Sequence, residues 1–137
     1  MDNKIVYVAK EKAEEIKNCL LYNGDNFIAE IEGAKIRTES DFVRAMSNAF
    51  AFPCELPAMK IGWYNDYICD LMWIEQKNIV LIIHEFDLML CDEPELKKVI
   101  LDDFEEIILP WWDGDVVGHM VGGTPRKFLV YLEQTFQ

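Results

Sequence analysis

Two tryptophans and two aspartates form a pattern in this sequence that fits binding to another protein. They recur at offsets of 0, 3, 7 and 10 residues, as Trp63, Asp66, Asp70 and Trp73, and on a helix this spacing places them along one stripe. Aspartates four residues apart repel each other on a helix, and tryptophan is enriched among the residues that dominate interfaces. A partner with arginine, lysine or histidine would relieve the repulsion and bury the indoles. The alternative is that the tryptophans pack under neighbouring loops while the aspartates face water.

A second group of residues has the chemistry of an enzyme. His84, Glu85 and Asp87 follow a strongly apolar segment, at the carboxyl end where open α/β sheets place ligand sites. Cys91 would be a nucleophile for a His84 base. The glycines of 114–123 have neither the G-x-G-x-x-G nor the P-loop spacing. We favour the competing interpretation, in which His84 bonds a backbone carbonyl and Cys91 is inert, and we expect no catalysis and no cofactor.

The cysteines do not indicate a metal site. Cys19, Cys54, Cys69 and Cys91 are far apart and form no C-x-x-C pair. In a cytosolic protein such cysteines are mostly small buried hydrophobes. With the two histidines they do not reproduce the ligand spacing of a zinc site, so we expect no bound metal.

The charge restricts the class of partner. The 137 residues include 25 acidic and 13 basic ones, for a formal net charge of -12, which disfavours nucleic acid and anionic membranes as ligands. Between Glu85 and Asp115 lie 11 acidic and two basic residues. This patch would attract basic partners, or it is only a solvated helix face. Since no apolar run approaches the roughly 18 residues of a membrane span and no signal peptide is recognisable, we expect a cytoplasmic protein.

The order of elements predicts an α/β fold. Apolar runs rich in β-branched residues predict strands at 5–9, 27–31, 78–86 and 127–133, and the unbroken run in the third predicts burial on both faces. Helices are predicted at 11–21, about 39–50, 59–74 and 94–109, with Pro110 ending the last one and a loop at 111–126. The last helix is expected to bury Leu96, Val99, Ile100, Phe104, Ile107 and Ile108. Strands alternating with helices indicate a small parallel sheet of three to four strands packed against helices in a single domain.

From about Phe27 to Glu133 the chain resembles the barstar family of bacterial ribonuclease inhibitors. The resemblance lies in the order of the segments FIAEIEG, IRTESDFVRAMSNAFAFP, NDYICDLMWI and NIVLIIHEF, followed by an acidic helix and a last strand. Residues 66–73 are similar to the D-C-L-x-D-L-x-W run of many members. Residues 1–26 lie outside the resemblance as an added strand–helix unit before a barstar-like domain at 27–137, the two forming one compact domain, and 110–126 is longer than the family leads us to expect.

The resemblance implies an inhibitor that inserts an acidic helix and the adjoining loop into a ribonuclease active site, where carboxylates mimic RNA phosphates. In the preferred register Asp66 matches the family's principal anchoring aspartate. Gly62 then stands where a second interface aspartate is usual, and Asn65 where an aromatic residue is usual. Shifting the register by four pairs Asp66 and Asp70 with the two family aspartates, at the cost of the match at Leu71 and Trp73.

A family glutamate late in the last helix corresponds to Glu106, with Glu105 as the alternative. The predicted ribonuclease-binding residues are Trp63, Asn65, Asp66, Asp70, Trp73 and Glu106. The expected partner is a basic ribonuclease or a nuclease toxin, the latter making the chain an immunity protein of a toxin–antitoxin pair. The free protein is expected to be monomeric, because facing aspartates disfavour a symmetric contact. The alternative is an acidic protein-interaction module of the same fold that does not inhibit.

Overall fold

The computed structural model describes residues 2–54, 56, 59–119 and 123–135, and its centre is one parallel sheet. The strands are β1 (Lys4–Ala9), β2 (Asn26–Glu32), β3 (Asn78–His84) and β4 (Lys127–Gln134). They lie side by side in the order β1-β4-β3-β2, and each neighbouring pair is parallel. The predicted α/β class with a small parallel sheet is therefore confirmed, with four strands.

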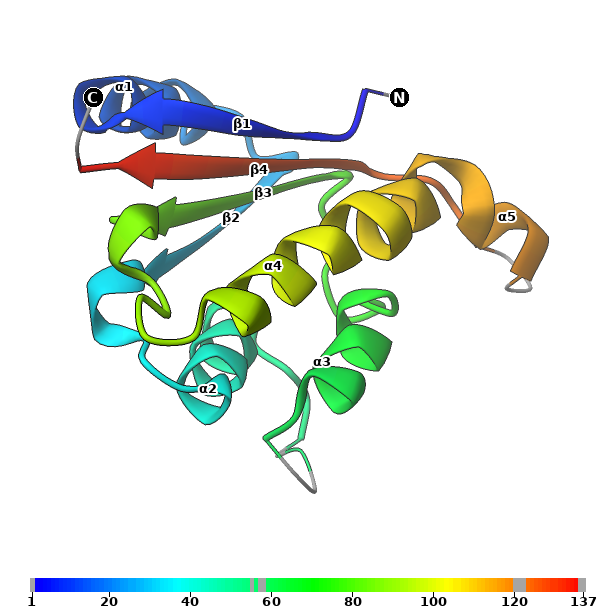
Figure 1. Cartoon of the computed structure of the whole chain (residues 1–137). Coiled ribbons are helices and arrows are strands. Elements are labelled where there is room, and N and C mark those ends of the chain that lie inside the picture. Colours follow the sequence, from blue (N-terminus) through cyan, green and yellow to red (C-terminus); the bar gives the residue numbers. More distant parts are fainter. Residues whose placement is uncertain (1, 55, 57–58, 120–122, 136–137) are drawn as a thin grey trace.

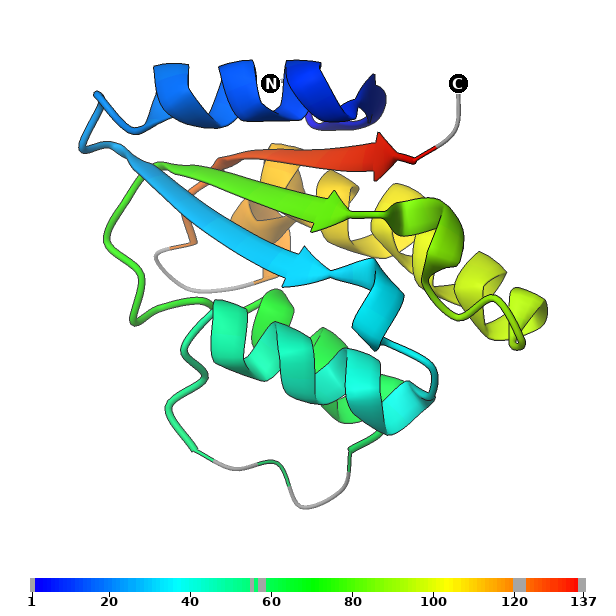
Figure 2. The same ribbon diagram turned by 90° about the vertical axis from the view of Figure 1, so that its left-hand side faces the viewer.

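Helices cover the two faces of the sheet unequally. Helix α1 (Lys10–Leu20) lies alone on one face, and α2 (Glu39–Ala49), α3 (Ile61–Ile68) and α4 (Pro94–Asp103) lie on the other (Figures 1 and 2). Short turns η1 (Gly33–Lys35) and η2 (Phe86–Leu88) follow β2 and β3. After α4 the chain continues through η3 (Phe104–Ile108), η4 (Trp111–Asp115) and α5 (Val116–His119) before it enters β4.

The strand β3 is the middle of the core. Ile79, Leu81 and Ile83 point to the side of α2, α3 and α4, and Val80 and Ile82 alternate with them toward α1. Each of the five is at most 2% exposed, which confirms the predicted burial on both faces. Because both faces are apolar, both must be covered by helices, and this requirement explains the layered architecture.

The helix that begins at Pro94 does not end where the sequence predicts. The chain stays helical past Pro110, so the predicted loop at 111–126 is wrong over its first nine residues. The turn η3 is π-helical, and there the Leu109 N–H donates to the Phe104 carbonyl, five residues back, whereas η4 is kinked at Gly114, whose φ and ψ are not helical. The wider turn before Pro110 accommodates a ring that has no N–H to donate.

Two side chains of the predicted buried stripe are exposed, one before the π-helical turn and one within it. Ile100, Phe104 and Ile108 belong to the core as predicted, but Val99 and Ile107 are 47% and 48% exposed. A π-helical turn rotates the following residues relative to the α-helical period, and so Ile107 leaves the expected buried stripe. The outer side of α4 and η3 therefore carries apolar as well as acidic residues.

A charged cluster joins α1 to the sheet. The His84 ring contacts Glu133 through Nδ1 at 2.5 Å and Glu30 through Nε2 at 2.8 Å, and Lys17 of α1 pairs with Glu30 at 3.0 Å. Glu133 is only 3% exposed. A neutral imidazole has one N–H, whereas carboxylates on both ring nitrogens accept a proton from each. The geometry therefore favours the doubly protonated, cationic form of His84.

The pKa values of the cluster shift accordingly. Burial alone would lower the pKa of His84, but the hydrogen bonds to Glu30 and Glu133 outweigh burial and raise it above its ordinary value of 6.5. For Glu30, burial opposes ionisation, but hydrogen bonds from His84 and Lys17 leave its pKa lowered. The prediction that His84 bonds a backbone carbonyl is wrong, because both ring nitrogens face carboxylates.

Gly33, in η1 just after β2, lies close to the backbone at the end of β3. A Cβ placed on Gly33 would lie 2.5 Å from the carbonyl oxygens of both His84 and Glu85. We expect Gly33→Ala to lower the free energy of unfolding by about 1–3 kcal/mol, because backbone atoms would have to move. The matched control is Gly62→Ala, where a Cβ meets nothing within 4 Å on the surface of α3. It should raise stability by up to about 1 kcal/mol, and equal effects of the two substitutions in urea unfolding would contradict the prediction.

Stability should depend on pH through His84. Because its folded pKa is raised, its contribution is complete below 6.5 and is lost as the pH rises through the folded value. Glu30, with a lowered pKa, adds a contribution that is lost as the pH falls through its folded value. His84→Ala should cost about 3 kcal/mol near pH 6, since Glu133 loses its buried partner. The difference from wild type should shrink in alkali, and urea unfolding across pH checks this. His119→Ala, at an exposed histidine, is the control that should leave the wild-type profile intact.

Candidate functional site

Helix α3 presents an acidic and aromatic surface to solvent. Its inner side packs into the core through Tyr64 and Ile68, which are 1% and 0% exposed. On its outer side Asp66 is exposed and Trp63 is 44% exposed. Within the described part of the chain the Asp66 carboxylate has no hydrogen bond or ion pair. The helix therefore holds an unpaired carboxylate beside a half-exposed indole.

The first turn of α3 is held by a side chain from α2. Lys60, at the N-cap, makes no side-chain hydrogen bond to the helix. Instead the Glu39 Oε2 accepts the Ile61 N–H at 3.0 Å, and its Oε1 lies 3.5 Å from Lys60 Nζ. A carboxylate at this position satisfies a free backbone donor and interacts favourably with the helix dipole. Glu39 thus fixes where the acidic helix begins.

The other end of α3 comes earlier than the sequence predicts. The helix ends at Ile68, and Leu71 adopts a left-handed backbone conformation with φ of 48°. Asp70 and Trp73 consequently lie beyond the helix. The prediction that Trp63, Asp66, Asp70 and Trp73 share one helix face is wrong, since only Trp63 and Asp66 belong to α3.

Trp73 packs inward, as the alternative for the tryptophans proposed. Its Nε1 donates to the Phe50 carbonyl at 2.8 Å. Its ring meets Phe52 edge-on at 5.8 Å between centroids and lies 6.2 Å from that of Tyr67. Phe52 and Tyr67 also stack on each other at 5.2 Å. This aromatic cluster fixes the loop that enters α3 against the segment that leaves it.

Asp70 is half-buried beside a cation from the C-terminal part of the chain. Its Oδ1 is enclosed without a hydrogen-bond partner among the described residues. Burial lowers the pKa of Arg126, and the charge of Asp70 opposes that shift, which places the two groups within electrostatic reach. Asp66 instead influences Cys69. Burial is the larger cause and the charge of Asp66 the smaller one, and together they raise the pKa of the Cys69 thiol to about 12. The Asp70 carboxylate is thus less accessible to a partner protein than the Asp66 carboxylate.

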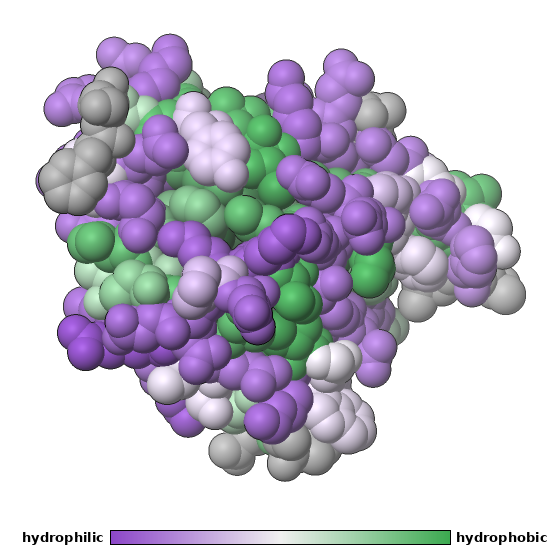
Figure 3. Space-filling view, viewed as in Figure 1, coloured by the Kyte–Doolittle hydropathy of each residue, from purple (hydrophilic) through white to green (hydrophobic). Residues whose placement is uncertain are grey.

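Asn65 connects α3 to α4 instead of facing solvent. Its Nδ2 donates to Asp103 Oδ2 at 3.1 Å, and the two helices lie side by side on this face (Figure 1). Glu106 lies three residues beyond Asp103, exposed on η3. The face is largely hydrophilic, with separate hydrophobic patches (Figure 3). The structure therefore places α3 beside α4 and leaves Trp63, Asp66 and Glu106 exposed, while the binding role of each stays a prediction.

Two residues that hold α3 were not found from the sequence. The Trp112 Nε1 donates to the Ile68 carbonyl at 3.0 Å, and the Arg126 Nη2 donates to the Leu71 carbonyl at 3.1 Å. A signal was present for Arg126, since it is the first Lys or Arg after Lys98 in an acidic part of the sequence. The first cation that follows so many acids is a candidate for an internal contact.

The enzyme-like group of residues is not assembled as a site. Both ring nitrogens of His84 are occupied by Glu30 and Glu133, and Cys91 is exposed outside that cluster. The part of the chain that is described contains no group of His, Cys, Asp or Glu side chains arranged to hold a metal ion. It also contains no helix long and apolar enough to cross a membrane.

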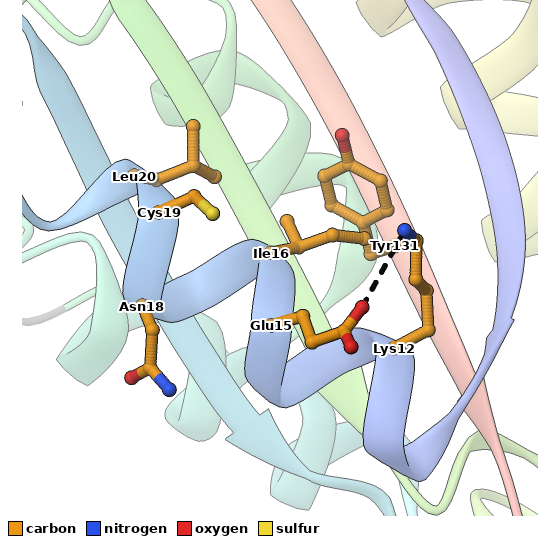
Figure 4. Close-up of a pocket in the computed structure, with 7 residues that line it drawn as sticks. All are labelled: Lys12, Glu15, Ile16, Asn18, Cys19, Leu20 and Tyr131. Atoms are coloured by element: carbon orange, nitrogen blue, oxygen red, sulfur yellow. Dashed lines mark ion pairs between the residues drawn. The ribbon is translucent and has the colours of Figure 1, made fainter.

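A groove of about 540 Å³ lies on the opposite face, between α1 and β4. Ile16 and Tyr131 form part of its floor, and an ion pair of Lys12 with Glu15 at 3.5 Å crosses its side (Figure 4). Burial raises the pKa of Tyr131. The groove is mainly apolar and lacks the converging polar groups that fix a small ligand.

Known structures resemble the fold. The chain superposes on the Aeropyrum pernix ORC2 protein in its ADP form with a TM-score of 0.57 and 15% identity, and on its ADPNP–ADP complexes with a TM-score of 0.56 and 12% identity. Each match covers 97% of this chain but only 35% of the other. Such likeness concerns the fold alone: here β1 passes into α1 at Ala9–Lys10 with no glycine-rich loop between them. A search of curated proteins found no match.

A family of sequences matches most of the chain. The sequence model described as Barstar (barnase inhibitor) covers residues 26–133. The match begins at β2 and ends in β4, so it includes α2, the acidic helix α3, β3 and α4. The unit formed by β1 and α1 lies before it, and the division of the chain near residue 26 stays a prediction. This chain belongs to the barstar family.

Proposed function

We propose that this protein inhibits a ribonuclease by covering its active site with the outer surface of α3 and the adjoining α4–η3 acids. The observation that carries the proposal is Asp66, an exposed carboxylate that is unpaired within the described structure and stands on a helix fixed at both ends. Membership of a family described as barnase inhibitors supports the same function. The proposed role is that of an inhibitor and not of an enzyme.

The charge of the surface fits such a partner. A ribonuclease site gathers lysine, arginine and histidine around a phosphate, so a carboxylate there replaces the phosphate in charge. Asp66 on α3 and Glu106 on η3 supply carboxylates from two elements, and Trp63 supplies apolar area beside the first. Interfaces of this kind depend on a few desolvated anchors within a complementary field. We propose Asp66 and Trp63 as the anchors.

The other predicted contact residues have different roles in this proposal. Trp73 and Asn65 support the surface from within, through Phe50 and Asp103. Asp70 lies at the margin, half-buried near Arg126. The exposure of Asp66 and the inward position of Asp70 favour the register in which Asp66 alone is the principal anchor.

Inhibition distinguishes this function from binding without inhibition. Purified protein should abolish RNA cleavage at a one-to-one ratio, tested on barnase and on any ribonuclease that the immobilised chain retains from a lysate of its own organism. A nuclease toxin retained in this way would identify the chain as an immunity protein. Retained basic proteins whose activity is unchanged would instead support the non-inhibitory module.

Asp66→Ala should weaken the complex by a factor of about 30 or more, as loss of a central charged anchor does. The matched control is Asp92→Ala, which removes the same charge from an exposed position in the turn before α4. Each substitution reduces the net charge equally, so a difference in dissociation constant measures the contact itself. Calorimetry or surface binding with the inhibited ribonuclease checks this, and equal losses would refute Asp66 as anchor.

Salt should slow association more than it speeds dissociation. With a net charge of -12, the chain attracts a basic enzyme over distances that ions screen, and association should fall by about tenfold or more between low and high ionic strength. Stopped-flow mixing at several salt concentrations measures the two rates. An association rate insensitive to salt would mean that the acidic surface does not guide the encounter.

A further inference from the structure

The end of the acidic helix needs support from outside itself. Helix α3 has eight residues, and a helix so short is not stable alone in water. Beyond Ile68 the chain turns through Leu71, which is not a glycine although its φ is 48°. The amides of Cys69, Asp70 and Leu71 close the helix by bonding the carbonyls of Asn65 and Tyr67. The Ile68 carbonyl remains to receive a bond from elsewhere, and the Leu71 carbonyl, which already accepts the Ile74 N–H at 3.0 Å, has a second lone pair for another donor.

Trp112 supplies the first of these bonds. Its indole is 2% exposed, and its Nε1 donates to the Ile68 carbonyl across 44 residues of sequence at 3.0 Å. A buried indole N–H needs an acceptor, and the last carbonyl of a helix needs a donor. One contact satisfies both groups. The segment after Pro110 therefore reaches back to α3.

Arg126 supplies the second bond and rests on the first. Its Nη2 donates to the Leu71 carbonyl at 3.1 Å, its backbone N–H donates to the Trp112 carbonyl at 2.9 Å, and its guanidinium lies 5.1 Å from the centre of the Trp112 ring. A cation at the carboxyl end of a helix also interacts favourably with the dipole. Arg126 and Trp112 thus act as one clamp on the end of α3.

The charge of Arg126 has the wrong sign for direct contact with a basic partner. Behind an acidic surface it cancels part of the field, and burial of its guanidinium is unfavourable. Its position is explained by the backbone that it holds and by Asp70, the acid that acts on it. If charge alone mattered, removal of this cation would strengthen binding to a basic ribonuclease.

We propose that Arg126, seated on Trp112, is a positioning residue that holds the end of α3 and the turn bearing Asp70 in the arrangement that the ribonuclease meets. This inference rests on the proposed function for its effect on binding. Its effect on the helix end is independent of any partner. The segment after Pro110 is then part of the binding apparatus without touching the ribonuclease.

The test compares Arg126→Met with Lys127→Met. Lys127 is exposed, makes no side-chain hydrogen bond or ion pair within the described chain, and carries the same charge. In the free protein, Arg126→Met should speed hydrogen exchange of the Cys69, Asp70 and Leu71 amides by about 10- to 100-fold, the factor for one charge-assisted hydrogen bond. The β3 amides should exchange with little change. Lys127→Met should alter neither set.

Binding to the ribonuclease gives the second measurement. Loss of a positioning residue should weaken the complex, whereas loss of a positive charge alone should strengthen it. Against the ribonuclease that the wild type inhibits, Arg126→Met should dissociate about tenfold faster, although its more negative charge favours association. Lys127→Met should bind as tightly as the wild type or more tightly. Arg126→Lys keeps the charge and a hydrogen-bond donor, and should therefore recover part of the lost affinity. If Arg126→Met does not fold, Arg126→Lys takes its place in both measurements.

The outcomes are separable. Unchanged exchange at Cys69–Leu71, or equal acceleration at these amides and in β3, would overturn the clamp. Tighter binding by Arg126→Met, matching Lys127→Met, would overturn its role in positioning. If no ribonuclease is inhibited, the proposed function fails, and hydrogen exchange still decides whether the clamp exists.

Discussion

The surface of this protein depends on backbone groups of one short helix that are bonded from outside it. Glu39 accepts the first amide of α3, while Trp112 and Arg126 donate to carbonyls at and beyond its last residue. Asn65 ties its side to α4. A helix so held does not need to be ordered when a partner arrives, and the entropy cost of binding is correspondingly lower. The acid on α3, Asp66, is held in place by groups of both charges elsewhere in the chain.

The face of the sheet that α1 covers is stabilised by a different set of interactions. Apolar residues of β3 are covered there by a single helix, α1, and one polar connection of this helix to the sheet is the chain from Lys17 through Glu30 and His84 to Glu133. A cation lies between two carboxylates, and a lysine neutralises the more exposed of them. Charge that would be costly at the edge of the core is compensated locally. The acidic field of the molecule is therefore a property of its surface.

The sequence was sufficient for the sheet and insufficient for the ends of the helices. The strand at β3 was predictable because its apolar run is continuous, and α2 because its apolar residues recur at helical spacing; a capping box of Thr38 and Asp41 starts that helix. The end of α3 was not predictable from the sequence, because the apolar and aromatic periodicity continues through Trp73. The helix end is held by Trp112 and Arg126, which lie 44 and 55 positions away from the residues they contact. The prediction that Pro110 ends the helix was wrong for a related reason: the local rule for proline assumes an α-helical turn, whereas the turn before Pro110 is π-helical. Exposure of Trp63 and Asp66 was predicted correctly, but the inward position of Trp73 depends on a carbonyl at Phe50.

The place of β1 in the sheet has a consequence for solubility. Within the region shared with the family, β4 would be the outermost strand next to β3, and its row of unpaired amides and carbonyls would be open to another chain. An open edge of such apolar composition is a template for aggregation. By pairing along β4 from Lys4 to Ala9, β1 closes that edge. The new outer edge is short and begins at a lysine, and the edge at β2 carries Glu30 and Glu32, so both borders of the sheet resist pairing with a second molecule.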